Sequence, residues 1–296
     1  MPPVGQLAPL AVVWLTWGIS YPAIHIALAG LDPWTLRVAV MLLGGGVLLG
    51  VAAASGRSLW VPRALWRDLA IGALFNMALF QTGTMFGIHL MGAGRASVLV
   101  YTMPIWATLF GRLLLGERVT PRRLAALVLG VLAVIVLLGQ GLDQARNAPL
   151  GAALTLLSAV SFGFGTVWTK LRPWPLDLTL LAGWQLILGG LPFVPIWLAT
   201  LAHNDPLGAP ASAWLAVLFL ALMANAVAYV LWFRQVQRLP AAVVSVGALV
   251  VPCVGVLSSA LVIGETIERN DAIALALVCS ALFLVLFERR PAGPAA

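Results

Sequence analysis

Two similar stretches of sequence decide the fold: GRASVLVYTMPIWATLFGRLLLGE at residues 94–117 and AAVVSVGALVVPCVGVLSSALVIGE at residues 241–265. They align at an offset of 148 residues, so that Pro104 matches Pro252 and Glu117 matches Glu265. The offset is half the length of the 296-residue chain. Each stretch is apolar, contains a proline near its middle and ends in Gly-Glu. We therefore predict an internal duplication, with one copy in residues 1–147 and the other in residues 148–296.

The similarity continues upstream of these two stretches. It includes Trp17-Gly18 with Phe162-Gly163, Asn76 with Asn225, and Phe80 with Tyr229, the last two after a one-residue slip. Hydropathy divides each half into five apolar stretches, and a bilayer core needs about 20 apolar residues per helix. The ten stretches span residues 7–29, 33–54, 67–90, 93–115, 121–140, 149–171, 177–200, 212–235, 240–263 and 270–288. The predicted fold is an all-α membrane protein with ten transmembrane helices.

Five is an odd number of spans, so the second half must enter the membrane from the opposite side. The loop after the fourth span is basic, whereas the equivalent loop after the ninth is acidic. With a cytoplasmic N-terminus, 13 of the 17 Lys and Arg residues fall on the inner side, as the positive-inside rule requires. We predict two inverted five-helix repeats in a bacterial inner membrane, with both termini in the cytoplasm.

The composition excludes several classes of protein. Hydrophobic residues make up 61% of the chain and charged residues 9%, too few charges to cover a soluble domain. The basic residues lie in short gaps between apolar stretches, which argues against nucleic-acid binding. No Cys or His spacing typical of a metal site is present, and we expect no metal, no cofactor and no enzymatic activity. The expected partners are membrane lipid and a small-molecule substrate, with the chain a monomer or homodimer.

These motifs resemble the drug/metabolite transporter superfamily, specifically its ten-helix EamA type. The resemblance rests on Trp17-Gly18, Leu36-Arg37, Ala96-Ser97 through Pro104, Leu115-Gly116-Glu117, residues 228–232 (AYVLW) and Ile263-Gly264-Glu265. It covers nearly the whole chain. It implies a transporter that exports amino acids and related small metabolites, without fixing the substrate.

Carboxylates are missing from the middle of every predicted span. Each Asp and Glu lies in a loop or near a helix end, and a charge kept at the bilayer centre usually marks coupling or cation binding. The arginines and Lys170 are also expected near helix ends. We therefore predict an uncharged pocket, which disfavours proton-for-cation exchange and phosphate-bearing substrates.

Neutral polar and aromatic residues do fall at mid-membrane. Asn76, Phe80 and Thr84 are four residues apart and are expected on one helix face. The candidate substrate-binding residues are Trp17, Tyr21, Asn76, Phe80, Gln81, Thr84, Tyr101, Phe164, Trp168, Asn225, Tyr229 and Ser245. The alternative role of such residues is hydrogen bonding between helices.

Two further pairs complete the candidate residues. Pro104 and Pro252 are expected near mid-helix, as hinges, and His25 and His89 are candidate titrating groups. The favoured function is export of neutral, including aromatic, amino acids or similar small metabolites by alternating access, driven by the substrate gradient. The alternatives are a drug/proton antiporter that uses a histidine, and a membrane scaffold without transport.

Overall fold

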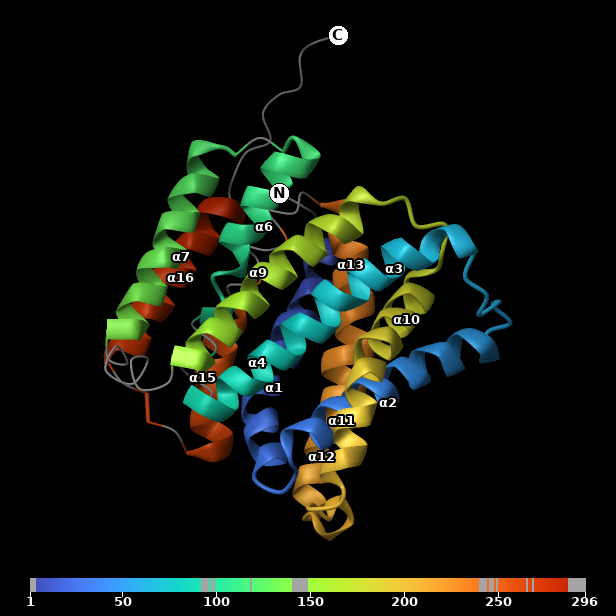
Figure 1. Cartoon of the computed structure of the whole chain (residues 1–296). Helices are drawn as coiled ribbons and strands as arrows, with labels where there is room; N and C mark the ends of the chain where they lie inside the picture. Colours follow the sequence, from blue (N-terminus) through green and yellow to red (C-terminus); the bar gives the residue numbers. More distant parts are fainter. Residues whose placement is uncertain are drawn as a thin grey trace.

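The computed structural model describes residues 4–91, 96, 99–117, 119–139, 149–239, 244, 248, 250–264, 266–267 and 269–286. All of the regular structure in these ranges is helical, and the chain reverses direction at short connections (Figure 1). Ser245, one of the candidate binding residues, and Ser97 lie outside the described residues.

The N-terminal half contains five helical rods, of which the third is built from four consecutive segments. The elements are α1 (Val4–Leu28), α2 (Pro33–Ala54), η1 (Arg63–Leu65), α3 (Trp66–Gly72), η2 (Ala73–Leu79), α4 (Phe80–Met91), α6 (Met103–Leu115) and α7 (Pro121–Gly139). The segment η2 is a π-helix, whose hydrogen bonds join residues five apart.

The C-terminal half repeats this order. Its elements are α9 (Pro149–Leu171), α10 (Leu178–Gly190), η3 (Leu191–Phe193), α11 (Val194–Thr200), η4 (Pro206–Gly208), α12 (Ala211–Phe219), η5 (Leu220–Val227), α13 (Ala228–Arg238), α15 (Val250–Ile263) and α16 (Arg269–Leu286). The segment η5 is again a π-helix, so both halves interrupt the third rod of the repeat in the same way. The short 3-10 segment η3 contains Pro192, where the sequence suggests a break in the seventh span.

Helix packing relates the two halves by an approximate two-fold axis. Helix α2 packs against α10 and α7 against α16, and in each of these pairs one helix is the repeat partner of the other. Helix α1 packs against α15, and its repeat partner α9 packs against α6, the partner of α15. Figure 1 shows α7 and α16 side by side at one edge of the bundle. If each helix is replaced by its repeat partner, these helix pairs therefore remain the same.

Helix ends also repeat between the halves. Asp32 and Asp177 each cap the N-terminus of the second rod, where the carboxylate accepts hydrogen bonds from backbone N–H groups. Gly116 and Gly264 follow the fourth rod with φ of 65° and 73°. This left-handed conformation favours glycine because it has no Cβ, which accounts for the Gly of both Gly-Glu motifs.

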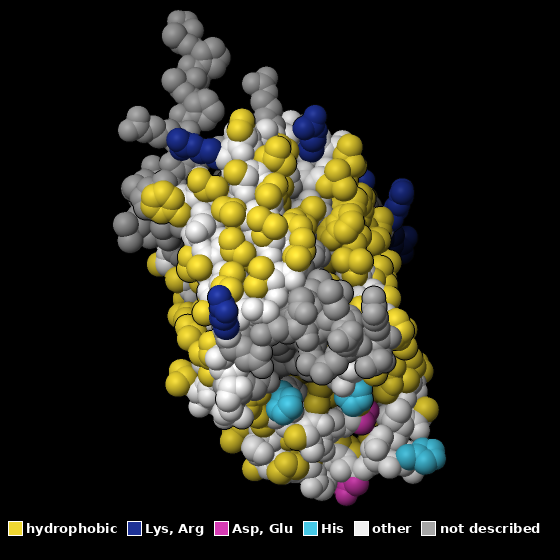
Figure 2. Space-filling model, turned by 90° about the vertical axis from the view of Figure 1, so that its left-hand side faces the viewer, with side chains coloured by type: hydrophobic (Ala, Val, Ile, Leu, Met, Phe, Trp, Pro, Cys, Tyr) yellow, Lys and Arg dark blue, Asp and Glu magenta, His cyan; other side chains and the backbone are white. Residues whose placement is uncertain are grey.

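The outer surface fits a lipid environment. Within the described residues, six rods are long and apolar enough to cross a membrane, and shorter apolar helices lie at 103–115, 250–263 and 272–281. On the face in Figure 2, hydrophobic side chains cover the broad middle, most Lys and Arg gather toward the end with the chain termini, and His, Asp and Glu lie toward the other end. The protein is a multi-pass integral membrane protein, and the predicted all-helical fold of two inverted repeats is confirmed.

Pro104 and Pro252, the prolines that match between the two repeats, do not lie near the middle of a helix. The expectation of a mid-helix position is therefore wrong. Tyr101 and Thr102 form a turn before α6, and Pro104 lies in the first turn of that helix. Ala248 is likewise in a turn, and Pro252 is the third residue of α15. The first turn tolerates proline because its N–H groups have no intrahelical partner there. Each proline therefore lies just after a turn, and helical residues (Val100 and Val244) precede both turns. The role of Pro104 and Pro252 as hinges stays a prediction.

Candidate functional site

A pocket opens within the bundle between the two halves. Its lining comes from α1, α2, α4 and the start of α6 in the N-terminal half, and from η5 and α13 in the C-terminal half. The empty space in the pocket, including open solvent at its mouth, is about 670 Å³. The lining residues are Trp17, Ser20, Tyr21, Ile24, Leu36, Arg37, Val40, Phe80, Gln81, Thr84, Val100, Tyr101, Met103, Leu220, Ala224, Asn225 and Tyr229.

Eight of the twelve candidate binding residues line this pocket. They are Trp17, Tyr21, Phe80, Gln81, Thr84, Tyr101, Asn225 and Tyr229. Six come from the first half of the chain and two from the second, so the structure brings together residues more than 140 positions apart, such as Gln81 and Asn225. Their role in binding remains a prediction.

The pocket contains an arginine, and the expectation of an uncharged pocket is therefore wrong. Arg37 is only 4% exposed and lies in the second turn of α2. Its Nη1 donates to Oε1 of Gln81 at 2.6 Å. The sequence places Arg37 near a helix end, and α2 does begin only four residues before it, but residues of α1, α4 and η5 line the same pocket and Arg37 is buried there. One signal was available: with a cytoplasmic N-terminus, Arg37 is one of the four basic residues that the sequence leaves on the outer side.

An amide network fixes the position of Gln81. Its Nε2 donates to Oδ1 of Asn225 at 2.7 Å and lies 3.4 Å from the hydroxyl of Tyr229. The hydroxyl of Tyr229 donates to the backbone carbonyl of Asn76 at 3.2 Å. Because the amide group of Gln81 donates to the second half, its oxygen faces Arg37. The network joins helices α2, α4, η5 and α13 around one corner of the pocket.

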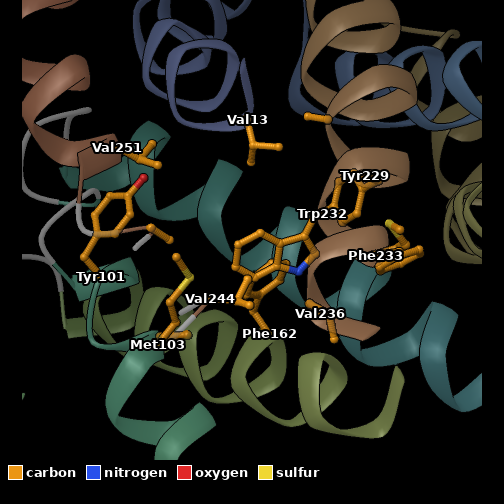
Figure 3. Packing of buried hydrophobic residues seen from close by; sticks show 14 of the residues in the cluster. Val13, Tyr101, Met103, Phe162, Tyr229, Trp232, Phe233, Val236, Val244 and Val251 are labelled. Carbon is orange, nitrogen blue, oxygen red and sulfur yellow. The ribbon is translucent and has the colours of Figure 1, made fainter. Parts of the chain in front are cut away.

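Aromatic rings form a wall of the pocket beside this network, where the Trp17 ring lies 5.6 Å from the Tyr229 ring. The indole Nε1 of Trp17 donates to the backbone carbonyl of Ala224 at 2.9 Å, and its ring lies 5.7 Å from Phe162 and 5.0 Å from Trp232. Figure 3 shows Trp232 and Phe162 meeting in the cluster beneath this wall. The hydroxyls of Tyr21 and Tyr101 lie 3.3 Å apart. This wall is apolar with a few hydroxyl groups, suited to the body of a small organic molecule.

Three candidate binding residues lie elsewhere in the bundle. Asn76 is fully buried, and its Nδ2 donates to Thr169 and Gln185 at 3.1 Å each. Asn76, Phe80 and Thr84 share one face as expected, since they contact Thr169, Phe162 and Ser158 of α9, but Asn76 is not among the residues that line the pocket. Phe164 and Trp168 stack on each other at 5.8 Å, outside the pocket lining.

The two histidines do not contribute to the pocket. His25 lies in the last turn of α1 and His89 in the last turn of α4. Both side chains are exposed, and neither is among the lining residues. Among the described residues, no group of three or more His, Cys, Asp or Glu side chains is arranged to hold a metal ion.

A second polar cluster closes the bundle at the far end of α9. Nζ of Lys170 lies 2.6 Å from Oε1 of Glu117, just after α6, and donates to the carbonyl of Leu239, just after α13, at 2.9 Å. Nearby, Trp168 donates to the carbonyl of Asp68 at 3.0 Å. The Arg172 guanidinium carbon lies 4.4 Å from the centre of the Trp168 ring. These contacts tie together the ends of helices from both halves, opposite the mouth of the pocket.

Sequence comparisons match this architecture. The sequence model of the EamA-like transporter family matches residues 7–139 and again residues 149–287. The chain belongs to the EamA-like transporter family. The two matches follow the internal repeat, so each half of this EamA-like chain resembles the same family unit.

Relatives of this EamA-like transporter chain align over nearly its full length. It is 28% identical to the "Probable amino-acid metabolite efflux pump" of Escherichia coli, covering 97% of this chain and 95% of that protein. It is 26% identical to "Protein PecM" of Dickeya dadantii, covering 93% and 91%. It is 24% identical to the "Uncharacterized transporter YoaV" of Bacillus subtilis, covering 93% and 94%.

One solved crystal structure is similar in fold. It superimposes with a TM-score of 0.74 at 22% sequence identity, covering 95% of this chain and 96% of the other. The EamA-like fold of the present chain is therefore shared with a protein of distant sequence.

Proposed function

We propose that this chain exports amino acids or similar small metabolites across the bacterial inner membrane by alternating access. The observation that carries the proposal is the pocket, because both halves of an inverted repeat build it and the Gln81–Asn225 hydrogen bond crosses between them. Transporters with inverted repeats bind substrate where the repeats meet. The relative named as an amino-acid metabolite efflux pump supports the substrate class.

The one-sided shape of the pocket supports alternating access. The lining includes the last half of α1 and the second turn of α2, while Lys170, Glu117 and the Leu239 carbonyl bridge the opposite end. With the basic, terminus-bearing end in the cytoplasm, this arrangement corresponds to an outward-facing state. Rocking one half against the other would open the Lys170 end and close the pocket mouth.

The proposed driving force is the gradient of the substrate itself. Among the described lining residues there is no Asp or Glu, and the two candidate histidines lie outside the lining. A histidine-dependent drug/proton antiporter and a scaffold without transport are the competing functions.

Flux in proteoliposomes tests the proposal. Purified protein is reconstituted, loaded with a mixture of labelled amino acids, and assayed for efflux with and without a pH gradient. We expect efflux without a pH gradient, and reduced efflux for Asn225→Ala. Gly46→Ala is the matched control, because no atom lies within 4 Å of the added Cβ. Efflux that requires a pH gradient would favour the antiporter, and absence of any flux would favour the scaffold; either result contradicts the proposal.

A further inference from the structure

Arg37 is a buried cation whose charge has no described partner. No salt bridge includes it, and among the described residues no carboxylate lines the pocket around it. Its Nη1 is bound to the neutral oxygen of Gln81, while its buried Nε has no hydrogen-bond partner. A buried charge without a counter-charge is costly. The structure therefore holds a positive charge at a position where an incoming anion would be stabilised.

The free edge of the guanidinium has the shape that a carboxylate fits. Gln81 occupies Nη1, which leaves the edge formed by Nε and Nη2. Two parallel N–H groups on one edge match the two oxygens of a carboxylate. Gln81 is itself held by Asn225, at 2.7 Å, and lies within reach of Tyr229, so the guanidinium is oriented before the ligand arrives.

The rest of the lining indicates the class of ligand. The other lining residues are apolar, aromatic or neutral polar side chains, with hydroxyls on Ser20, Tyr21, Thr84 and Tyr101. This lining neutralises one negative charge and offers no described carboxylate to an ammonium group. A phosphate dianion would keep part of its charge unpaired beside a single arginine, whereas a carboxylate monoanion is matched.

We infer that Arg37 binds the carboxylate of the transported molecule, and that the preferred substrate is a small organic monoanion with an apolar body, such as an N-acylated amino acid or an aromatic acid. This inference rests on the proposed transport function and names the substrate class of the same pocket. Zwitterionic amino acids are weaker ligands of this site, because their ammonium group gains only hydroxyl and carbonyl partners.

Three probes separate the charges, and the two acetylated probes are nearly equal in size. N-acetyl-L-phenylalanine is a monoanion, L-phenylalanine a zwitterion, and N-acetyl-L-phenylalaninamide is neutral. Binding to the purified full chain is measured by calorimetry or by the shift in melting temperature. We expect the monoanion to bind about tenfold or more tightly than the amide, as a charge-assisted contact allows, with the zwitterion between them.

Two substitutions of Arg37 test the assignment. In Arg37→Gln the ratio of monoanion affinity to amide affinity is expected to fall to about one, a result that a merely structural arginine would not give. In Arg37→Lys, which keeps the charge but loses the planar fork, we expect part of the preference to remain. A wild-type protein that binds the amide as tightly as the monoanion, or that binds neither, would overturn the inference.

Transport separates this inference from the proposed function. Efflux of labelled amino acids with no advantage for the monoanion would remove the assignment of Arg37 and leave the exporter standing. Absence of flux for every probe and for the amino-acid mixture would remove both. Monoanion efflux that Arg37→Gln leaves unchanged, with the protein folded by its melting temperature, would also refute the role of Arg37.

Discussion

Two regions related by the internal repeat differ in what fills them. Around Arg37 the helices leave a pocket, whereas Asn76 is fully buried among the described residues and does not line that pocket. Gly44 on α2 approaches Ala221 and Asn225, and its partner Gly189 on α10 approaches Ala73 and Met77. This match places Ala182, which is fully buried, where the other half has Arg37. Similar helix packing thus supports a charged pocket on one side and a sealed polar core on the other.

The sealed region pairs some of its polar groups internally and leaves others buried without a hydrogen bond, among them Oδ1 of Asn76 and Nε2 of Gln185. Asn76 donates to Thr169 and to Gln185, and all three residues are fully buried. In the open region Arg37 and Gln81 face a cavity. Transporters of this architecture work by exchanging an open and a closed side, so we interpret the difference as one state of that exchange. Substitutions in the Asn76 region and in the Arg37 region can each test this comparison.

The largest effect is expected from crowding the sealed region. In Gly165→Ala the added Cβ would lie 2.2 Å from Oδ1 and 3.0 Å from the backbone nitrogen of Asn76. Overpacking of this kind costs about 1–3 kcal/mol, so we expect a clear fall in melting temperature and in expression. Gly46→Ala, with open space around its Cβ, should melt like the wild type. Equal melting temperatures for the two variants would show that the Asn76 region is not tightly packed.

The two repeat-related asparagines should separate stability from transport. Asn76→Ala leaves Gln185 and Thr169 without their buried donor, at a cost of about 1–3 kcal/mol in the free energy of unfolding. Asn225→Ala frees Gln81 from its 2.7 Å contact, and we expect efflux to fall by about tenfold with a smaller loss of stability.

Thermal unfolding and efflux are measured on both asparagine variants. If Asn225→Ala lowers stability as much as Asn76→Ala and leaves efflux intact, the distinction between a binding region and a sealed region is wrong.

Removing the contacts of Lys170 should shift the population from the outward-facing state to the inward-open state. Lys170→Met removes the contacts with Glu117 and the Leu239 carbonyl, so the inward-open state should become more populated. A cysteine at Ser20, in a background with Cys253 and Cys279 replaced by serine, reports the pocket mouth. We expect its labelling by an impermeant maleimide from outside to fall several-fold in Lys170→Met.

The conservative variant Lys170→Arg serves as the control for this labelling. It retains a cation beside Glu117 and should leave the labelling rate close to that of the parent. Faster labelling in Lys170→Met would mean that the Lys170 contacts do not hold the outward-facing state.

The smallest effect is expected at a single hydroxyl between the two regions. Tyr229→Phe removes the donor to the carbonyl of Asn76 and the contact with Gln81, for about 1 kcal/mol of stability. Tyr21→Phe removes a hydroxyl whose recorded partner is Tyr101 at 3.3 Å and should cost less. Chemical denaturation of both variants measures the difference, and a reversed order would argue against a stabilising bond at Asn76.

Hydropathy and the repeat were sufficient to predict the fold. Span length follows from bilayer thickness, and loop charge follows from topology, so both are visible in a single sequence. Trp17, Gln81 and Asn225 were predictable for the pocket because polar or amphipathic side chains at mid-membrane need partners or a cavity. The position of the duplicated prolines failed because hydropathy does not register a turn such as Tyr101-Thr102 inside an apolar run.

The main error at the site has a physical cause. Arg37 lies in the second turn of α2, near the helix end that the sequence predicts, yet its side chain is buried and lines the pocket. Burial depends on the neighbouring helices, and their positions cannot be read from one span alone. Asn76 shares a helix face with Phe80 but lies outside the pocket, because its amide is bonded to Thr169 and Gln185.

Each of the two π-helical segments accepts a hydrogen bond from a side chain of the other half. Tyr229 of the second half donates to the main-chain oxygen of Asn76, and Trp17 of the first half donates to that of Ala224. The two acceptors lie within one residue of equivalent places in the repeat, because Asn76 matches Asn225. Because each acceptor belongs to the polypeptide backbone, no substitution on the accepting helix deletes it. Substrate preference can therefore diverge through the other lining residues, whereas Trp17 and Tyr229, which line the pocket and also donate these bonds, are needed for the attachment.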